Sequence, residues 1–484
     1  MMKKKLAFFI AAAMSLAACA VPVYADESEL MYEDLNYEIA DDGHVIITNC
    51  YQSAETCRIP EEIDGAPVTE IADSAFSECY FLTKLTLPES ITKIGRQAFS
   101  ACTALESIYL PAEIEYMGAG VFDGCTALKA VDIPAGLTEL PEASFYECSD
   151  LERVSLPEGI EVIEPESFYK CSSLSGITLP ESVTSIGDYA FQGCSSIKSI
   201  ALPAETVNLG KYIFQDCVSL SDIEADEQNE MFCDKDGVLF TKDGATLVRY
   251  PEAKEGTSYK VPDGCTSLAN GCFVDAVSLK EIDMNQAVMY GMDIFFRCTG
   301  IEEITVPEGA VDISASMFAY CSSLKNVQLP STLKNINQYA FYTCAALEEF
   351  TVPEGVEKIG AYAFFNCIGL KKLRLPDSIT ELGDGAMGYY AESEDTEPQK
   401  LPNFVAEYGH NDVIYEFTKL YELEGTGRGD SDIWKWIAVG AGAIVLAGAV
   451  VLIVVHRRKA MIPKPVKGGR TGSVTKPDQK KKKG

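Results

Sequence analysis

Apolar and polar residues alternate along this chain in a pattern that returns every 23 residues. Each unit has the form LxxIxLPxxIxxIGxxAFxxCxx, and one interval, from Leu279 to Ile301, is a residue shorter. The units start at Leu82, Leu105, Leu128, Leu151, Leu174, Ile197 and Leu220, and later at Leu279, Ile301, Leu324, Leu347 and Leu370. One unit of this length cannot bury its own apolar side, so the repetition predicts stacked coils, that is, a solenoid.

Each part of the unit has a physical role. At its start the alternation predicts a short strand, with Leu85 turned inward and Lys84 turned outward in the first full unit. Pro88 has no N–H for a ladder and therefore ends that strand. The Ala-Phe pair and the cysteine return to the interior, where the phenylalanines from Phe76 to Phe364 are expected to form one column.

Because proline, Ala-Phe and cysteine recur together from roughly Asn36 to Met387, the chain resembles the leucine-rich repeats of BspA-like bacterial surface proteins, of the Treponema pallidum type. The resemblance implies an α/β fold, a leucine-rich-repeat solenoid with its parallel strands on the concave face. We expect about fourteen coils over residues 59–388, between an N-terminal cap at 26–58 and a C-terminal cap at 389–424.

One part of the array departs from the repeat. Between Leu220 and Leu279 the chain is longer than two units, and apolar residues alternate on both sides of Asp243-Gly244. This pattern predicts a β-hairpin inserted near residues 233–251. An insertion of this kind is either a feature of the family fold or a binding protrusion, since insertions in solenoids often lie on the working face.

The N-terminus has the pattern of an export signal. Lys3, Lys4 and Lys5 precede an apolar run, and Val23–Ala25 is a small-residue cleavage site, so residues 1–25 are predicted to be a signal peptide. The segment ending at Cys19 also resembles a lipobox, and whether that cysteine carries a lipid stays open.

The C-terminal part has the pattern of a membrane anchor. Residues 437–455 carry no charge, and we predict a transmembrane helix at 433–456 after a stalk at 425–432. The tail at 457–484 holds eleven Lys and Arg and one Asp, which predicts a cytoplasmic tail and extracellular repeats. Localisation is therefore expected at the cell membrane, with a single span.

Composition excludes several classes of function. With 72 Asp and Glu against 40 Lys and Arg, the chain has a formal net charge of −32, and its acidic repeats would repel nucleic acid. Three scattered histidines make a His-based metal site or a catalytic triad improbable. Asp234–Gly237 begins like a calcium loop but lacks the closing Glu. We expect no metal, no cofactor and no enzymatic activity.

The seventeen cysteines also have a packing explanation. Eleven occupy one position of the repeat, and Ala276 takes that position in another coil. A position that exchanges Cys for Ala favours buried free thiols over disulfides. Only Cys50 and Cys57 are left as a candidate disulfide, which the sequence does not decide.

Binding residues are expected where the repeat leaves side chains free. The outward strand positions that we select as ligand contacts are Lys84, Tyr109, Arg153, Glu303, Gln328, Lys372 and Arg374. Tyrosines that recur 23 residues apart are either a contact ladder or cover for the phenylalanine column. Arg428, Gly429 and Asp430 form an integrin-type tripeptide, which we assign to the stalk because the membrane would obstruct a receptor there.

The family resemblance and the exported, anchored organisation together predict an extracellular recognition or adhesion protein. It would bind protein partners on host matrix or on other cells through its repeat surface. The alternative is a structural or sensory scaffold protein of the cell envelope that works within the wall. No motif in the sequence identifies the ligand.

Overall fold

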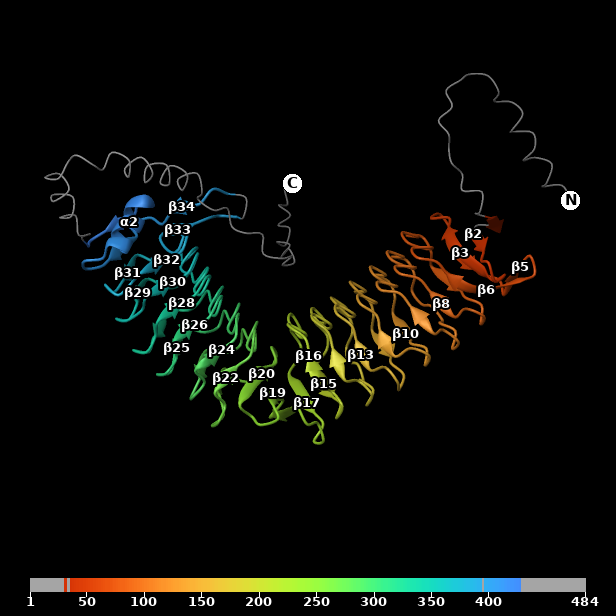
Figure 1. The fold of residues 1–484 in the computed structure, drawn as a ribbon, viewed down its shortest axis with the longest axis horizontal. Coiled ribbons are helices and arrows are strands. Elements are labelled where there is room, and N and C mark those ends of the chain that lie inside the picture. The colour runs from red at the N-terminus through yellow and green to blue at the C-terminus, as the bar shows by residue number, and fades with distance from the viewer. Residues whose placement is uncertain (1–29, 33–34, 394–395, 428–484) are drawn as a thin grey trace, which may run out of the picture.

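The structure, a computed structural model, describes residues 30–32, 35–393 and 396–427. The chain winds into a β-solenoid of about 16 turns, and the turns stack into an arc with a corner near its middle (Figure 1). Successive coils pair in parallel with the repeat register, for example Val162 with Ser185 and Ile163 with Ile186. Each coil crosses two ladders of short strands, which we call the outer ladder and the inner ladder.

The outer ladder contains the strands at the start of each unit. They are β4 (Thr56–Arg58), β7 (Lys84–Thr86), β10 (Ala130–Asp132), β12 (Arg153–Ser155), β15 (Ser199–Leu202), β17 (Asp222–Ala225), β21 (Ser258–Lys260), β23 (Glu281–Asp283), β25 (Glu303–Thr305), β27 (Asn326–Gln328), β29 (Glu349–Thr351), β31 (Lys372–Arg374), β35 (Val405–Glu407) and β36 (Glu424–Gly425).

The inner ladder contains the strands that follow the proline by a few residues. They are β6 (Ala66–Ile71), β8 (Lys93–Ile94), β9 (Tyr116–Met117), β11 (Glu139–Leu140), β13 (Val162–Ile163), β14 (Ser185–Ile186), β16 (Asn208–Leu209), β20 (Thr246–Arg249), β22 (Ser267–Leu268), β24 (Met289–Tyr290), β26 (Asp312–Ile313), β28 (Asn335–Ile336), β30 (Lys358–Ile359) and β32 (Glu381–Leu382).

Both ends of the array extend these ladders. At the N-terminus β1 (Leu30–Tyr32), β2 (Leu35–Ile39) and β3 (Val45–Cys50) are antiparallel, and β3 then pairs in parallel with β6, which also pairs with β5 (Glu62–Ile63). At the C-terminus β35 and β36 continue from β31, beside the hairpin of β33 (Tyr389–Tyr390) and β34 (Gln399–Lys400). The helix α2 (Asp412–Leu420) begins where the Asn411 side chain accepts a hydrogen bond from the amide of Ile414.

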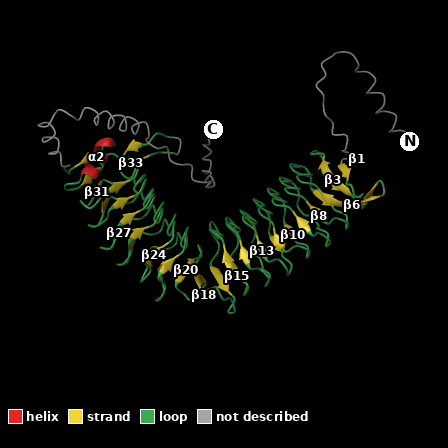
Figure 2. Ribbon diagram, viewed as in Figure 1, coloured by secondary structure: helices red, strands yellow, loops and turns green. Residues whose placement is uncertain are grey.

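The predicted α/β class is wrong. The described residues hold one α-helix, α2 in the C-terminal cap, and the rest of the array consists of strands and turns (Figure 2). The physical reason lies in the turn segment, the GxxAFxxC part of each unit. There residues such as Gln97 and Ala101 have φ of 53° and 57°, in the left-handed region, and this interrupts any right-handed helix.

The predicted transmembrane helix is not supported either. In the described ranges no helix combines the length and the apolar character that crossing a bilayer requires. The span predicted at 433–456, the signal peptide predicted at 1–25 and the tail predicted at 457–484 lie outside the described residues.

The strands at the start of each unit are also not on the concave side. In Figure 1, β25, β29 and β31 lie toward the outside of the arc, and β26, β30 and β32 lie nearer its inside. The outer ladder is split into small sheets, such as β10–β12 and β15–β17. In the turn segments, by contrast, backbone hydrogen bonds such as Phe99 N to Val121 O join coil to coil. Because the array is curved, neighbouring coils lie further apart at the outside of the arc than at its inside. The outer ladder therefore has fewer hydrogen bonds between strands.

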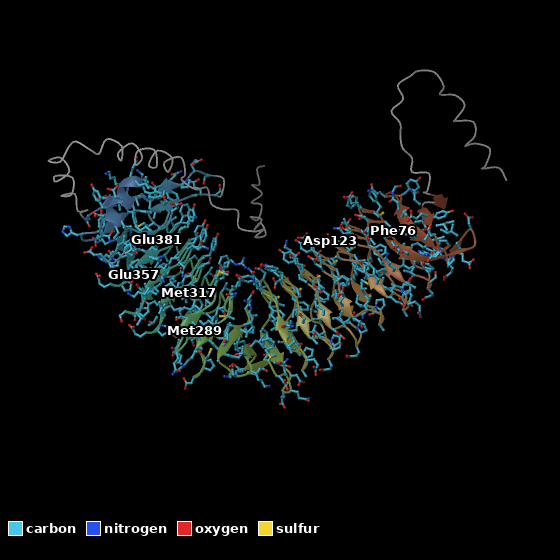
Figure 3. The ribbon with its side chains drawn as sticks, in the orientation of Figure 1. Phe76, Asp123, Met289, Met317, Glu357 and Glu381 are labelled. Atoms are coloured by element: carbon cyan, nitrogen blue, oxygen red, sulfur yellow. The ribbon has the colours of Figure 1, made fainter. Side chains whose placement is uncertain are left out.

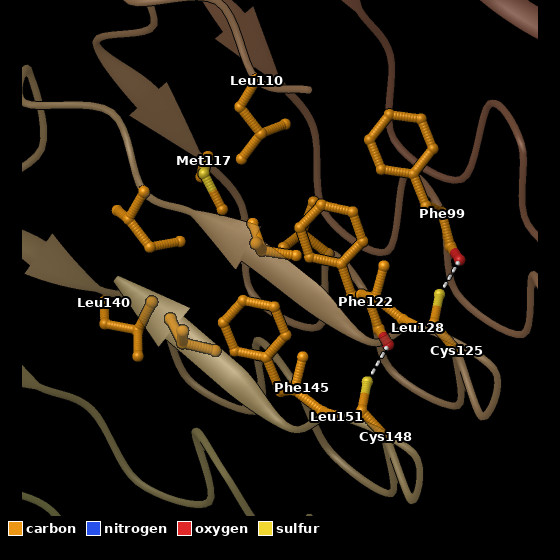
Figure 4. Packing of buried hydrophobic residues seen from close by; sticks show 14 of the residues in the cluster. Phe99, Leu110, Met117, Phe122, Cys125, Leu128, Leu140, Phe145, Cys148 and Leu151 are labelled. Carbon is orange, nitrogen blue, oxygen red and sulfur yellow. Dashed lines mark hydrogen bonds between the residues drawn. The ribbon is translucent and has the colours of Figure 1, made fainter. Parts of the chain in front are cut away.

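The core is a column of phenylalanine rings at the Ala-Phe position. Phe99, Phe122 and Phe145 are fully buried, and their ring centroids are 5.5 Å apart (Figure 4). Leucines such as Leu128 and Leu151 pack beside them. This spacing follows from coil stacking at strand distance, and it turns the apolar side of every unit into one continuous interior.

The cysteine column closes this interior. Cys125 donates a hydrogen bond from Sγ to the carbonyl oxygen of Phe99 in the preceding coil, at 3.1 Å, and Cys148 does the same to Phe122 at 3.0 Å (Figure 4). Burial raises the pKa of both thiols. In the described part of the chain the cysteines of this column, such as Cys125 and Cys148, are free thiols.

We expect the buried thiols to resist alkylation in the folded protein. Neutral, solvent-excluded thiols are poor nucleophiles, whereas the Cys233 thiol is partly exposed and should react first. Iodoacetamide labelling followed by peptide mass spectrometry, before and after denaturation, measures this difference. Fast labelling of Cys148 in the native state, or a disulfide between successive coils, would contradict the packing role of the column.

The insertion forms the corner of the arc. The strands β18 (Phe232–Lys235), β19 (Val238–Thr241) and β20 are antiparallel neighbours, and β20 then joins the inner ladder through β22. The two residues between β18 and β19, Asp236 and Gly237, have φ of 52° and 69°, as a type I′ turn requires. The core divides here into two clusters, one for each arm.

Candidate functional site

The outer ladder presents side chains in a regular pattern. In β7 Leu85 is buried between exposed Lys84 and Thr86, and β12, β25 and β29 have the same alternation. Parallel register places equivalent residues of neighbouring coils beside each other, as Glu303 beside Asn326. The result is a long surface whose composition is set by the outward residues.

The structure places most of the predicted contact residues on this surface. Lys84, Arg153, Glu303 and Gln328 are exposed, and Tyr109 is 63% exposed. The Arg153 guanidinium forms an ion pair with Asp132 of the preceding coil at 2.6 Å. These side chains come from coils spread along the array, so they form a surface and not one compact site.

A groove of about 540 Å³ brings two of the predicted residues together. It lies where β23 and β25 face each other without joining one sheet, and it is lined by Glu303, Gln328, Glu281 and Asp283, among others. The shortened repeat between Leu279 and Ile301 lies at this same place. We attribute the break in the ladder to that missing residue, because pairing of the strands requires matching register.

The last repeat strand, β31, carries two basic side chains, Lys372 and Arg374, and both are neutralised by acidic side chains of the chain itself. Lys372 Nζ lies 3.3 Å from Glu407 Oε1 and 4.0 Å from Glu349 Oε1. Arg374 contacts the same two carboxylates, at 2.9 Å and 3.0 Å. The repeat pattern predicted the two exposed cations of β31 but not their neutralisation. Glu407 comes from the cap strand β35, whose position the repeat does not define.

Tyrosines line the turn segments in stacked pairs. The ring centroids of Tyr146 and Tyr169 are 4.6 Å apart, and those of Tyr339 and Tyr362 are 5.3 Å apart. Asp123, in the equivalent segment of another coil, lies at the inner edge of the arc (Figure 3). Burial raises the pKa of Tyr146 and Tyr339, which fits rings that partly cover the core.

A cavity of about 1110 Å³ opens between the inner ladder and the C-terminal cap. Ion pairs join Lys358 to Glu381 at 2.9 Å and Lys400 to Glu422 at 2.8 Å in its walls, and Tyr389 also lines it. These opposite charges compensate each other, so the cavity has no marked preference for a ligand charge. Sequence reasoning missed it because the hairpin β33–β34 lies outside the repeat.

The corner contains a buried polar cluster that sequence reasoning also missed. Arg249 is 8% exposed and donates to Gly271 O at 2.8 Å, to Phe214 O at 3.0 Å and to Glu252 Oε1 at 2.7 Å. These bonds connect the last coil of the N-terminal arm to the first coil of the C-terminal arm. Burial raises the pKa of Glu252 to about 8, against the lowering effect of Arg249.

Further charged contacts cross the corner at its edge. Arg297 contacts both Asp216 and Asp275 at 2.5 Å, and the Tyr212 hydroxyl donates to Asp293. Burial raises the pKa of Asp275, against the lowering effect of Arg297. Residues 81 positions apart meet here, which no local spacing in the sequence reveals.

Neither the calcium-like sequence nor the integrin-type tripeptide forms a binding site within the described residues. Within 30–32, 35–393 and 396–427, no group of three or more His, Cys, Asp and Glu side chains is arranged to hold a metal ion. Asp236 and Gly237, the last two residues of the calcium-like sequence Asp234–Gly237, form the turn between β18 and β19. The integrin-type tripeptide Arg428–Asp430 lies outside the described residues.

Comparison with known families matches most of the array. The family model described as "BspA type Leucine rich repeat region" matches in six copies, over residues 69–175, 161–235 and 266–394. A search of curated proteins finds no match.

Solved bacterial structures share the architecture. A leucine-rich cell surface protein from Faecalibacterium prausnitzii is 28% identical, with 78% of this chain and 97% of that chain covered and a TM-score of 0.63. A leucine-rich repeat protein from Bacteroides ovatus is 25% identical, with 83% and 99% covered and a TM-score of 0.56. The pneumococcal vaccine antigen PcpA shares the fold at 22% identity, with 83% and 98% covered and a TM-score of 0.51.

Proposed function

Since the chain belongs to the BspA-type leucine-rich-repeat family, we propose that it is a bacterial cell-surface recognition protein that binds a protein partner through its outer ladder. The observation that carries the proposal is the outer ladder itself. It is a long array of exposed side chains in fixed register, with Tyr109 63% exposed near one end and a groove beside Glu303 further along. Affinity on such a surface is shared by several coils.

The ion pairs of the outer ladder favour partner contacts away from β31. Lys372 and Arg374 are already paired with Glu349 and Glu407, so they offer an acidic partner little net charge. Lys84 and Tyr109, in contrast, present exposed side chains from neighbouring coils. An aromatic side chain with a nearby cation is typical of the few residues that dominate a protein interface. We therefore place the main contact in the N-terminal arm.

Two tyrosines of one coil provide a matched test. Tyr109 projects from the outer ladder and Tyr116, 47% exposed, from the inner ladder. Against immobilised host matrix glycoproteins, Tyr109→Ala in the full chain should weaken capture by about tenfold, as expected for a central aromatic contact. Tyr116→Ala should leave capture within about twofold, and both variants should keep their stability within about 0.5 kcal/mol.

Equal effects of the two substitutions would contradict the outer ladder as the binding surface. The scaffold alternative is tested separately by protease treatment of intact cells. Release of repeat peptides supports a surface-exposed recognition protein, whereas complete protection favours an envelope protein that works within the wall.

A further inference from the structure

A second cavity, of about 250 Å³, lies at the corner between the two arms. It exists because the inner ladder stops at β16 and resumes at β20, so that the coil ending near Phe214 does not stack directly on the coil that contains Gly271. The insertion supplies part of the wall through Phe232, Leu239 and Val248. The interior is therefore mostly apolar and separate from the outer ladder.

The charges that line this cavity are unusual for the chain. Arg249 and Lys211 line it, and no Asp or Glu does, although acids outnumber basic residues 72 to 40 in the whole sequence. Lys211 is exposed at the rim with Asn270, whereas Arg249 is buried. Glu252, which accepts a hydrogen bond from Arg249, is not among the lining residues, and because burial raises its pKa to about 8 it is neutral at pH 7 and leaves the charge of Arg249 uncompensated. Two cations in an apolar wall favour an anionic ligand.

Arg249 also has a donor left over. Its Nη atoms are used by Gly271 O, Phe214 O and Glu252, but its buried Nε has no hydrogen-bond partner among the described residues. A buried N–H without an acceptor costs free energy, and buried polar atoms in folded proteins normally have partners. A ligand oxygen would supply the missing acceptor.

We propose that the corner cavity binds a small carboxylate with an apolar body, with the carboxylate toward Arg249 and Lys211 and the apolar part against Phe232, Leu239 and Val248. The volume fits about eight non-hydrogen atoms, since a water molecule in the liquid occupies about 30 Å³. Two sources share this chemistry, a free organic acid and the C-terminal carboxylate of a peptide that ends in an apolar residue. The site is distinct from the outer ladder and does not depend on its function.

The first experiment titrates the full-length chain with benzoate and with benzamide, which has nearly the same shape without the charge. Calorimetry should show benzoate binding at least about tenfold tighter than benzamide, because only the carboxylate gains charge-assisted hydrogen bonds. A short peptide ending in phenylalanine, compared with its C-terminal amide, distinguishes the two sources. Equal affinity for acid and amide in both pairs, or no binding of any acid, overturns the proposal.

Substitutions then locate the binding. Ala269→Leu fills the cavity without removing a charge and should weaken benzoate binding at least about tenfold, since the wall residue then occupies ligand volume. Lys211→Gln should weaken it by about three- to fivefold, whereas Lys198→Gln, an exposed lysine outside the cavity, should not. If Ala269→Leu binds benzoate as the wild type does while remaining folded, the ligand lies elsewhere and the assignment is wrong.

Discussion

Phe191→Ala should lower the free energy of unfolding by about 3–5 kcal/mol. The Phe191 ring is fully buried and stacks on Phe168 at 5.1 Å and on Phe214 at 6.0 Å. Its removal opens a cavity between coils that the backbone hydrogen bonds of the turn segments hold at a fixed spacing, so the neighbours cannot close over it.

Reversible urea unfolding of the full chain measures the change, and Phe81→Ala is the control. Phe81 is 64% exposed, so its substitution should alter stability by less than about 0.5 kcal/mol. A loss below about 1 kcal/mol for Phe191→Ala would show that the column contributes little, and that coil stacking depends mainly on the backbone ladders.

The second large effect concerns Glu252 at the corner. Its folded pKa of about 8 lies above the ordinary value of 4.5, because burial disfavours the charged carboxylate. Between these two pH values the folded chain keeps a proton that the unfolded chain has released. The contribution of Glu252 to the free energy of unfolding should therefore be highest below about pH 4.5. It should fall by several kcal/mol as the pH rises through 8.

Glu252→Gln isolates this contribution, since the amide resembles the protonated acid and can still accept the bond from Arg249. The variant should match the wild type at pH 5 and exceed it in stability at pH 9. Asp216, Asp275 and Arg297 are common to both proteins and affect the pKa of Glu252 less than burial does, so the difference between the two stability curves reports mainly on Glu252. Parallel stability curves would mean that Glu252 is charged in the fold and acts as an ordinary partner of Arg249.

The repeat phase predicted the interior well. Leu85 is buried and Lys84 exposed, Phe99 lies in the column, and the cysteines at the shared repeat position are free, all from one 23-residue pattern. These features depend on side-chain polarity within a single unit, which a sequence records directly.

The repeat pattern could not predict the curvature of the array, its all-β turn segments or the corner. Which edge of a coil lies outside depends on small differences in coil spacing, and no residue type encodes them. The left-handed backbone of Gln97 and Ala101, neither of them glycine, is imposed by the packing of the coil. The contacts of Arg297 with Asp216 and of Tyr212 with Asp293 join residues 81 positions apart, which only the stacking of the two arms brings together.

The division of the core at the corner also has a mechanical meaning. A surface protein that holds a partner while its own end is fixed carries tension along its axis, and a solenoid transmits that tension from one coil to the next. Among the described residues the ring stacking ends at Phe214 and resumes at Tyr250, and hydrogen bonds from Arg249 to Phe214 O and to Gly271 O link the two sides. Because the apolar core divides at this interface, we expect it to separate under load before the stacked coils of either arm, so that the molecule extends in two stages.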